Sequence, residues 1–522
     1  MYHRYTTFCQ LTIICLLSAA SIMAQHTNVR ISNLNLPNEP AICINPKNPK
    51  QVVAGSNLNN IYYSADGGAN WKKTPVSSPY GIWGDPVIVT DTAGAFYYLH
   101  LSNPSNGNWI DRIVVQKSTD AGVTWSPGTF TGLNGTKAQD KHWMAVDPRN
   151  NSLHITWTQF DKYGSAAVKD SSIILYSRST DNGLTWTAPQ RISQLGGDCI
   201  DSDNTAEGAI PCIGPNGAVY VSWSNRNNLW FDRSLDGGKT WQSEDIFIGD
   251  QPGGWDYEIP GISRANGLPY TACDLSNGPR RGTIYVNWSD QRNDVSDTDV
   301  WLCKSTDEGL TWSKPVRVND DNTQRQQFFT AMTIDQQTGY LWFVYYDRRR
   351  YNDLRTDVYM AVSKDGGETF QNFRVSETPF VPRTDVFFGD YNGISAHNNL
   401  VRPIWTRMDS NDLSVWTALI KPEMINASTE PASTSVSLDT PVPNPFSEKT
   451  VIAFKLRNTA RVSLHLYDAK GNRVATLIDN ERREYGKYVE EIRSDVLHLA
   501  TGNYTAVLTA DGKVLKEKMI KI

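Results

Sequence analysis

The stretch STDEGLTW, residues Ser305–Trp312, decides the fold because its pattern occurs six times in the chain. The pattern is Ser-x-Asp-x-Gly, then two residues, then Trp or Phe. The other five copies begin at Ser64, Ser118, Ser179, Ser234 and Ser363. Self-similarity at such a spacing is typical of repeat architectures, in which each repeat is one supersecondary unit.

Each copy of this octamer follows a run of bulky alternating residues, such as IILYSRS, which ends at Ser179. A strand that runs into Asp-x-Gly is typical of a hairpin. The Asp carboxylate can accept backbone N–H groups, and Gly supplies a positive φ. The closing aromatic ring covers apolar surface as the next strand begins. We therefore interpret the octamer as a folding device rather than a catalytic motif.

A second repeat, an acidic or polar residue followed by a small or apolar run, occurs seven times. The runs start at Glu39, Asp85, Asp140, Glu207, Glu258, Gln327 and Asp390. Each is followed by a second strand-like run, such as VYVSWSN at residues 219–225. Short apolar strands fit the innermost strand of a propeller blade. The sequence predicts an all-β, seven-bladed β-propeller, or a six-bladed one if one unit is an insertion.

The last predicted blade supplies only three strands from its own region of the chain. The N-terminal segment NVRISNL, residues 28–34, offers a fourth strand. Such a strand would close the ring and remove the exposed edges that a linear array would leave.

The remaining segments differ from the propeller in composition. Residues 1–24 have a basic start, a short apolar run and small residues before a cleavage point, which predicts a secretory signal peptide. The propeller is expected over residues 28–422, a Ser/Thr/Pro-rich linker over 423–440, and a small β-sandwich over 441–522. No segment is long and apolar enough for a transmembrane helix. The net charge of -5 argues against a nucleic-acid partner.

The predicted mature chain keeps five cysteines, an odd number that excludes a complete disulfide framework. Two interpretations stay open: Cys199 pairs with Cys212 across a short loop, or all five are free thiols. No Cys/His spacing indicates a zinc site, and no cofactor is expected.

In a propeller, each blade contributes the start of its first strand and the loop after its second strand to the same region. The candidate functional residues lie in these segments. These share one face, opposite the octamer hairpins, so the acidic starts should ring the mouth of the central channel. Arginines on the neighbouring loops complete this face: Arg226, Arg292, Arg348 and Arg407. Aromatic residues near the strand starts are candidates for stacking on sugars: Trp83, Trp143, Trp255, Tyr257 and Tyr391.

Paired carboxylates are the usual groups of glycoside hydrolysis, and crowding raises the pKa of one of them. Arginine forks recognise carboxylate or sulfate groups on a substrate. A ring of oxygens would also suit calcium. The competing interpretation is structural, with the acidic residues accepting hydrogen bonds from neighbouring blades.

The octamer resembles the Asp box, or BNR repeat, of sialidases, and six copies resemble the array of sialidase-like β-propellers. The resemblance implies Tyr391 as nucleophile, Glu258 or Asp390 as its partner, and Asp85 as acid/base. The Phe/Tyr-Arg-Ile-Pro motif of sialidases is absent. Its nearest counterpart is Tyr257-Glu258-Ile259-Pro260, which has a carboxylate in place of the arginine.

Four segments near the C-terminus resemble the type A sorting domain of the type IX secretion system of Bacteroidetes-type bacteria. They are PVPNPF (441–446), LHLYDAKGNRV (464–474), GNYTAVL (502–508) and KMIKI (518–522). The resemblance implies export through the periplasm to the medium or the outer-membrane surface, with the secretion machinery as a partner.

These observations support three hypotheses. The first is a secreted sialidase-like glycoside hydrolase acting on a glycan through Asp85, Glu258, Asp390 and Tyr391. Its binding residues would be Glu39, Asp140, His142, Glu207 and the four arginines. The second is a non-catalytic propeller that binds a glycan or a protein at the cell surface. The third is a polysaccharide lyase that depends on His142 together with Tyr391.

Overall fold

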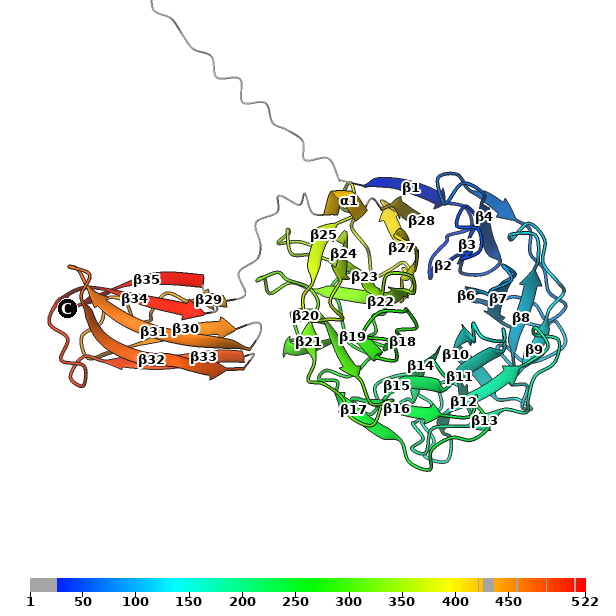
Figure 1. The fold of residues 1–522 in the computed structure, drawn as a ribbon, viewed down its shortest axis with the longest axis horizontal. Helices are drawn as coiled ribbons and strands as arrows, with labels where there is room; N and C mark the ends of the chain where they lie inside the picture. Colours follow the sequence, from blue (N-terminus) through cyan, green and yellow to red (C-terminus); the bar gives the residue numbers. More distant parts are fainter. Residues whose placement is uncertain (1–25, 421, 426–435, 457–458, 485, 511–512) are drawn as a thin grey trace, which may run out of the picture.

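Seven four-stranded antiparallel sheets form a closed ring in the computed structural model, and a separate smaller β-structure follows (Figure 1). The structure describes residues 26–420, 422–425, 436–456, 459–484, 486–510 and 513–522. The predicted signal peptide lies outside these residues. The prediction of seven blades is confirmed.

The first four blades follow the chain in order. Blade 1 contains β2 (Ala41–Ile44), β3 (Val52–Ser56), β4 (Asn60–Ser64) and β5 (Lys72–Thr74). Blade 2 contains β6 (Gly84–Thr90), β7 (Phe96–Leu101), β8 (Ile113–Ser118) and β9 (Thr129–Thr131). Blade 3 contains β10 (Ala138–Val146), β11 (Leu153–Phe160), β12 (Ser172–Ser179) and β13 (Gln190–Arg191). Blade 4 contains β14 (Glu207–Ile213), β15 (Val219–Asn225), β16 (Asn228–Ser234) and β17 (Ile246–Asp250).

The last three blades complete the ring. Blade 5 contains β18 (Tyr270–Cys273), β19 (Ile284–Asp294), β20 (Asp297–Ser305) and β21 (Val316–Arg317). Blade 6 contains β22 (Gln327–Asp335), β23 (Tyr340–Asp347), β24 (Asp357–Ser363) and β25 (Gln371–Arg374). Blade 7 contains β26 (Gly393–His397), β27 (Leu400–Asp409), β28 (Asp412–Leu419) and the N-terminal β1 (Thr27–Ser32).

The N-terminal strand closes the ring as predicted, because β1 pairs antiparallel with β28. Asn28 also joins β1 to the segment that follows β25 of blade 6. The side-chain Nδ2 of Asn28 donates to the carbonyl of Val375 at 2.9 Å, and its side-chain Oδ1 accepts from the backbone N–H of Glu377 at 3.0 Å. The Glu377 carboxylate accepts in return from the backbone N–H of Asn28.

The octamers are the hairpins between the third and fourth strands of blades 1 to 6. In the third copy, the Ser179 hydroxyl donates to Asp181 at 2.7 Å and accepts from the backbone N–H of Gly183 at 2.9 Å. Asp181 also accepts from the backbone N–H of Thr185 at 2.9 Å. Gly183 has a φ of +82°, which favours glycine. Their predicted role as a folding device agrees with these contacts.

The octamers also bond to the preceding blade. In each copy, a backbone carbonyl at the fourth or fifth position accepts a hydrogen bond from a side chain of that blade. The donors are Arg402, Thr74, Thr129, Arg178, Arg233 and Lys304, and the acceptors are Gly67, Gly122, Gly183, Gly237, Glu308 and Gly366. At the junction between blades 6 and 7, which has no octamer, the Asn28 contacts join the two blades.

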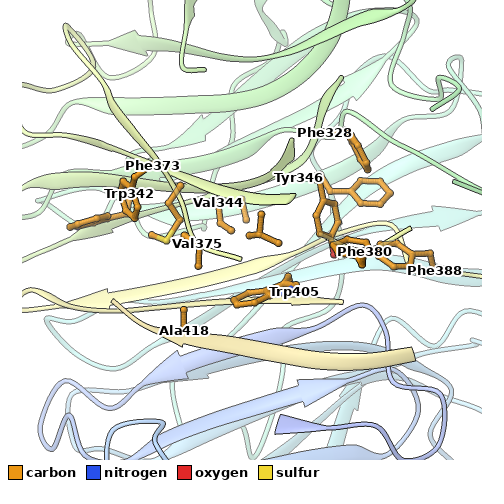
Figure 2. Close-up of a cluster of buried hydrophobic side chains, with 14 of the residues drawn as sticks. Phe328, Trp342, Val344, Tyr346, Phe373, Val375, Phe380, Phe388, Trp405 and Ala418 are labelled. Atoms are coloured by element: carbon orange, nitrogen blue, oxygen red, sulfur yellow. The ribbon is translucent and has the colours of Figure 1, made fainter. Parts of the chain in front are cut away.

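A large hydrophobic cluster fills the space between blades 6 and 7 (Figure 2). Tyr346 of β23 packs against Phe380 at 5.5 Å between ring centroids, and Phe380 stacks on Phe388 at 5.6 Å. Trp405 of β27 and Ala418 of β28 belong to the same cluster. Each side chain of this size contributes about 1.5–3 kcal/mol when fully buried, so this cluster helps to hold the ring closed.

A repeated β-bulge sets the starts of four first strands. The pairing register shifts at Gly84/Val87 of β6, Asp140/Trp143 of β10, Glu207/Ile210 of β14 and Phe328/Ala331 of β22. The residue after each first bulge position has a positive φ; these residues are Asp85 (+55°), Lys141 (+45°), Gly208 (+77°) and Phe329 (+50°). Lys141 and Gly208, rather than Asp140 and Glu207, are thus the structural equivalents of Asp85.

The predicted first strand of blade 5 is wrong in position. The run that starts at Glu258 is not a strand, and β18 begins at Tyr270 instead. The reason is a long connection after β17, in which glycines and prolines interrupt strand pairing.

After the propeller, a short helix α1 (Pro422–Ile425) precedes the second β-structure. One sheet contains β29 (Val436–Leu438), β30 (Lys449–Leu456) and β33 (Gly486–Arg493). The other contains β31 (Ala460–Asp468), β32 (Arg473–Arg483), β34 (Gly502–Ala510) and β35 (Lys513–Lys521). β29 lies inside the range predicted as linker. Within the described residues, no helix has the length and apolar character needed to cross a membrane.

Candidate functional site

A cluster of charged side chains lies where first strands from different blades begin. Lys141 is its centre: its Nζ donates to Asp390 Oδ1 at 3.2 Å and Oδ2 at 3.0 Å, and lies 3.7 Å from Asp85 Oδ2. Lys141 is buried, and it reaches these carboxylates from the bulge of β10. The left-handed bulge thus positions a cation of blade 3 against carboxylates of blades 2 and 7.

Arg264 supplies a second cation from the connection between β17 and β18. Its Nε lies 3.4 Å from Asp390 Oδ2, and one terminal nitrogen lies 3.1 Å from Asp201 Oδ2. The Arg264 side chain is 29% exposed, so the cluster reaches solvent here. Neither Arg264 nor Lys141 is among the residues predicted from the sequence. The Asp140-Lys141 pair was a usable signal for Lys141, whereas Arg264 is in an irregular segment without one.

The carboxyl groups of the cluster differ in pKa, so some are ionised and others are protonated. Burial alone would raise the pKa of Asp390, but the charges of Lys141 and Arg264 outweigh it and hold that pKa below its ordinary value. Glu39 shares a hydrogen bond with Asp390, and burial together with the charge of Asp85 raises the pKa of Glu39 well above its ordinary value. Asp390 is therefore the ionised member of this pair and Glu39 the protonated one.

Asp85 and Asp140 form the part of the cluster with intermediate acidity. Burial raises the pKa of Asp85, and Lys141 opposes that effect. Burial, reinforced by the charge of Asp85, raises the pKa of Asp140 to about 7. The Asp85 side chain is 14% exposed, which makes it reachable from solvent. Burial therefore favours the protonated form of both carboxyl groups.

Glu207, at the start of β14, is fully buried, and neither carboxyl oxygen has a hydrogen-bond partner within the described residues. Burial and then the charges of Asp201 and Asp140 raise its pKa well above the ordinary value. Glu207 is therefore a neutral acid at physiological pH.

Aromatic rings form a wall beside Lys141. Trp143 contacts Tyr391 edge to face at 5.7 Å between ring centroids, and Tyr270 at 6.3 Å. Burial raises the pKa of Tyr391 well above its ordinary value, and its hydroxyl has no hydrogen-bond partner among the described side chains and backbone. Between these rings, Lys141 and Asp390 lies a cavity of about 20 Å³, which is room for one water molecule.

Within the described residues, three other predicted residues form no ion pair with this cluster. Glu258 is exposed in the connection before β18. Gln327 is buried, and its side chain bonds to Asn319 and Asp347. His142 is fully buried, and burial lowers its pKa to about 3. His142 is therefore a neutral imidazole inside the fold.

The four predicted arginines have local partners instead of cluster carboxylates. Arg226 donates to the carbonyl of Gly196 from an exposed position. Arg292 pairs with Asp290 at 2.5 Å, and Arg407 pairs with Asp409 at 2.7 Å. Arg348 is buried, and its guanidinium donates to the carbonyl of Pro260 at 2.7 Å. Lys141 and Arg264 pair with the cluster carboxylates instead.

Of the predicted stacking residues, Trp255 and Tyr257 are buried and Trp83 is exposed. The five cysteines of the described chain are free, so Cys199 and Cys212 do not pair. Across the described ranges, no group of three or more His, Cys, Asp or Glu side chains has an arrangement that could hold a metal ion.

Comparisons with known proteins give one family match and several distant likenesses. The model of the secretion system C-terminal sorting domain matches residues 442–522. A xyloglucanase of Paenibacillus sp. is 28% identical over 233 residues, 43% of this chain and 19% of that protein. Xyloglucanase Xgh74A of Acetivibrio thermocellus is 29% identical over 309 residues, 52% of this chain and 32% of that protein. The chain thus spans between a fifth and a third of the length of these relatives.

Among solved structures, the Hadza microbial sialidase Hz136 is similar to this chain with a TM-score of 0.40 and 15% identity. The similarity covers 72% of this chain and 75% of that one.

Residues 442–522 therefore form a type IX secretion sorting domain, as the sequence predicted. This domain marks the protein for secretion or for attachment at the outer-membrane surface.

Proposed function

We propose that this protein is a secreted carbohydrate-active β-propeller, and more specifically a glycoside hydrolase with its reaction centre at the channel mouth. The observation that carries the proposal is the charge division within the cluster. Lys141 and Arg264 hold the pKa of Asp390 below its ordinary value, while burial raises the pKa values of the neighbouring Glu39, Asp85 and Asp140. Pairs of carboxyl groups with separated pKa values are the acid/base equipment of glycoside hydrolysis. The distant likeness to xyloglucanases supports the same class.

Asp85 and Asp140 are the proposed working pair. The Asp85 side chain is 14% exposed, Asp140 is buried, and the charge of Asp85 contributes to the raised pKa of Asp140. In the proposed reaction, the protonated member donates to the leaving glycosidic oxygen and the ionised member activates water. Lys141 and Arg264 hold Asp390 in place and set the charge around this pair. Tyr391 and Trp143 provide the apolar wall for the sugar ring.

The sialidase resemblance implied Tyr391 as a nucleophile and Glu258 or Asp390 as its partner. Tyr391 remains beside the cluster, but its raised pKa disfavours the phenolate. Glu258 is exposed and forms no ion pair within the described chain, so the proposed centre does not include it. Arg264, rather than Arg292, Arg348 or Arg407, is the proposed contact for an anionic group on a glycan.

The test is incubation of the purified protein with sialylated, sulfated and uronate-bearing glycans, xyloglucan and arabinan, with products read by mass spectrometry. We expect Asp85→Asn and Asp140→Asn to lower turnover by roughly 10²- to 10⁴-fold, the usual contribution of general acid–base catalysis. Asp353→Asn is the matched control, because Asp353 is an exposed carboxylate that pairs with Arg355 away from the cluster. Undiminished turnover in both cluster variants would remove the proposed centre.

The second candidate is a non-catalytic glycan-binding propeller. It is favoured by the small cavity beside Lys141 and by the internal pairing of the charged residues. Binding of a polysaccharide without product from any glycan would support this candidate. No comparable observation favours a lyase, because His142 is buried and its pKa is low.

A further inference from the structure

Three aromatic side chains form an exposed ledge beside the channel mouth. Trp83 precedes β6, Trp109 lies between β7 and β8, and Tyr163 lies between β11 and β12. Trp83 and Trp109 meet edge to face at 5.7 Å between ring centroids, and Trp109 meets Tyr163 at 5.3 Å. Trp83 and Trp109 are each 41% exposed. Blades 2 and 3 thus bring together rings that are far apart in the sequence.

The ledge is held by backbone hydrogen bonds on both sides. The N–H of Trp83 donates to the carbonyl of Leu101 at 2.9 Å. Ile110, next to Trp109, is fully buried, and its carbonyl accepts from the backbone N–H of Gln139 at 2.7 Å. The two indoles are therefore exposed on an anchored segment. Exposed apolar surface on such a segment is typical of a binding site.

The ledge is connected to the charged cluster. The hydroxyl of Tyr163 donates to Asp201 at 2.5 Å. Asp201 pairs with Arg264 at 3.1 Å, and Arg264 lies 3.4 Å from Asp390. A chain of direct contacts thus runs from the exposed indoles to the proposed reaction centre.

The connection that carries Trp109 is polar but uncharged. The connection SNPSNGNW, residues 102–109, contains no ionisable side chain. Its exposed hydroxyl and amide groups are those of Asn103, Ser105, Asn106 and Asn108. Amide and hydroxyl groups donate and accept hydrogen bonds, as sugar hydroxyls do. Aromatic faces beside such groups can contact the apolar C–H face of a sugar ring while the amides and hydroxyls bond to its hydroxyl groups. A surface of two indoles is smaller than a typical protein–protein interface.

We propose that Trp83, Trp109 and Tyr163 form a stacking subsite for neutral sugar rings of an extended glycan. The glycan would continue from the ledge to the cluster, where Arg264 and the Asp85–Asp140 pair meet its reactive unit. The inference rests on the proposed function for the kind of ligand, but it concerns binding of a polymer rather than turnover.

The test is affinity electrophoresis of the full protein in gels that contain soluble xyloglucan or arabinan. We expect Trp109→Ala and Trp83→Ala each to weaken retardation by roughly tenfold, as loss of an aromatic contact should. Trp109→Phe keeps a ring and should retain most of the binding. Phe247→Ala is the matched control, because Phe247 is 49% exposed on the outermost strand β17 and packs on Trp230. This control should bind like the wild type.

The outcomes separate the subsite from the reaction centre. Asp85→Asn should keep polymer binding while losing turnover. Trp109→Ala should lose polymer binding while still cleaving a short oligosaccharide that the wild type cleaves. If the Trp83→Ala and Trp109→Ala variants both bind the polysaccharide as tightly as the wild type, the proposed subsite is wrong. Failure of the wild type to bind either polysaccharide would also overturn it, whatever the turnover measurements show.

Discussion

Lys141 shows how one backbone feature can determine the character of a site. The positive φ at the bulge of β10 places a lysine where blade 2 has Asp85 and blade 4 has Gly208. A buried ammonium group is unfavourable unless carboxylates surround it, and Lys141 has two within 3.7 Å. The same contacts keep Asp390 ionised. Loss of Lys141 would therefore affect both stability and the charge of the site.

We expect Lys141→Met to lower the free energy of unfolding by about 3–5 kcal/mol, the usual cost of removing one partner of a buried pair. The loss should be larger near about pH 8 than near about pH 5, because Asp390 without its cation can take up a proton as the pH falls. Urea denaturation at both pH values measures this. Lys137→Ala is the control, since Lys137 pairs with Asp161 at the surface. Its effect should be about 0–1 kcal/mol. Equal effects of the two changes would contradict the assigned burial of the pair.

The raised pKa of Asp140 leads to a separate prediction about how stability depends on pH. Its pKa of about 7 in the folded protein lies above the ordinary value of 3.8. The folded state therefore binds the proton more tightly than the unfolded state. Its stabilising contribution is complete below about pH 4 and is lost as the pH rises through about 7. Asp140→Asn cannot titrate, so its Tm should fall less than that of the wild type between about pH 5 and pH 8.

Scanning fluorimetry across that range measures the difference in Tm. Asp353→Asn, at an exposed position, should follow the wild-type profile. A profile of Asp140→Asn parallel to that of the wild type would show that Asp140 titrates normally in the fold.

At the scale of the element, the octamer could be predicted from the sequence because its contacts are local. Ser179, Asp181, Gly183 and Thr185 bond to one another within seven residues. The strand starts could not be aligned as reliably, because a bulge shifts the side chains by one residue and moves Lys141 into the place expected for Asp140. A pairing register depends on the neighbouring strand, which the local pattern does not specify.

The candidate site was predictable only in part for the same reason. Glu39, Asp85, Asp140, Glu207 and Asp390 do influence one another electrostatically. Arg264 lies in a connection without a strand pattern, so its position depends on tertiary packing alone. The predicted arginines lie at or just after the ends of second strands, and there each finds a partner nearby, as Arg292 does in Asp290.

Gly183 tests the backbone requirement of the octamer. A Cβ added there would lie 3.4 Å from Leu153 Cδ1, an ordinary contact, so steric overlap is not the main cost. The cost should come from the φ of +82°, which an L-residue adopts at about 1–2 kcal/mol. We expect Gly183→Ala to lower the free energy of unfolding by that amount in urea denaturation.

Gly249→Ala is the matched control for Gly183→Ala. Gly249 has no positive φ, and an added Cβ would meet nothing within 4 Å. Its substitution should leave stability unchanged or raise it slightly, since alanine restricts the unfolded chain. Similar destabilisation by both changes would show that the left-handed turn is not the source of the cost.

At the scale of the whole molecule, the ring closes through residues from its two ends. β1 pairs with β28, and the large hydrophobic cluster lies between blades 6 and 7 beside that closure (Figure 2). The other junctions have an octamer carbonyl bonded to the preceding blade, but this one has the reciprocal contacts of Asn28 and Glu377. The closure therefore depends on a pair 349 residues apart in the chain.

A double-mutant cycle on Asn28 and Glu377 tests this closure. Asn28→Ala removes the side-chain bonds to Val375 and Glu377, and Glu377→Ala removes the carboxylate that accepts from the Asn28 backbone. Each change should lower the free energy of unfolding by about 0.5–1.5 kcal/mol, because these hydrogen bonds are solvent-exposed. Because the two reciprocal hydrogen bonds hold the same two backbone segments together, loss of one should weaken the other. The double variant should therefore lose less than the sum, with a coupling of about 0.5 kcal/mol or more. Urea denaturation of the four proteins gives this coupling. Strictly additive losses would mean that Asn28 and Glu377 stabilise their own blades separately and do not join blade 6 to blade 7.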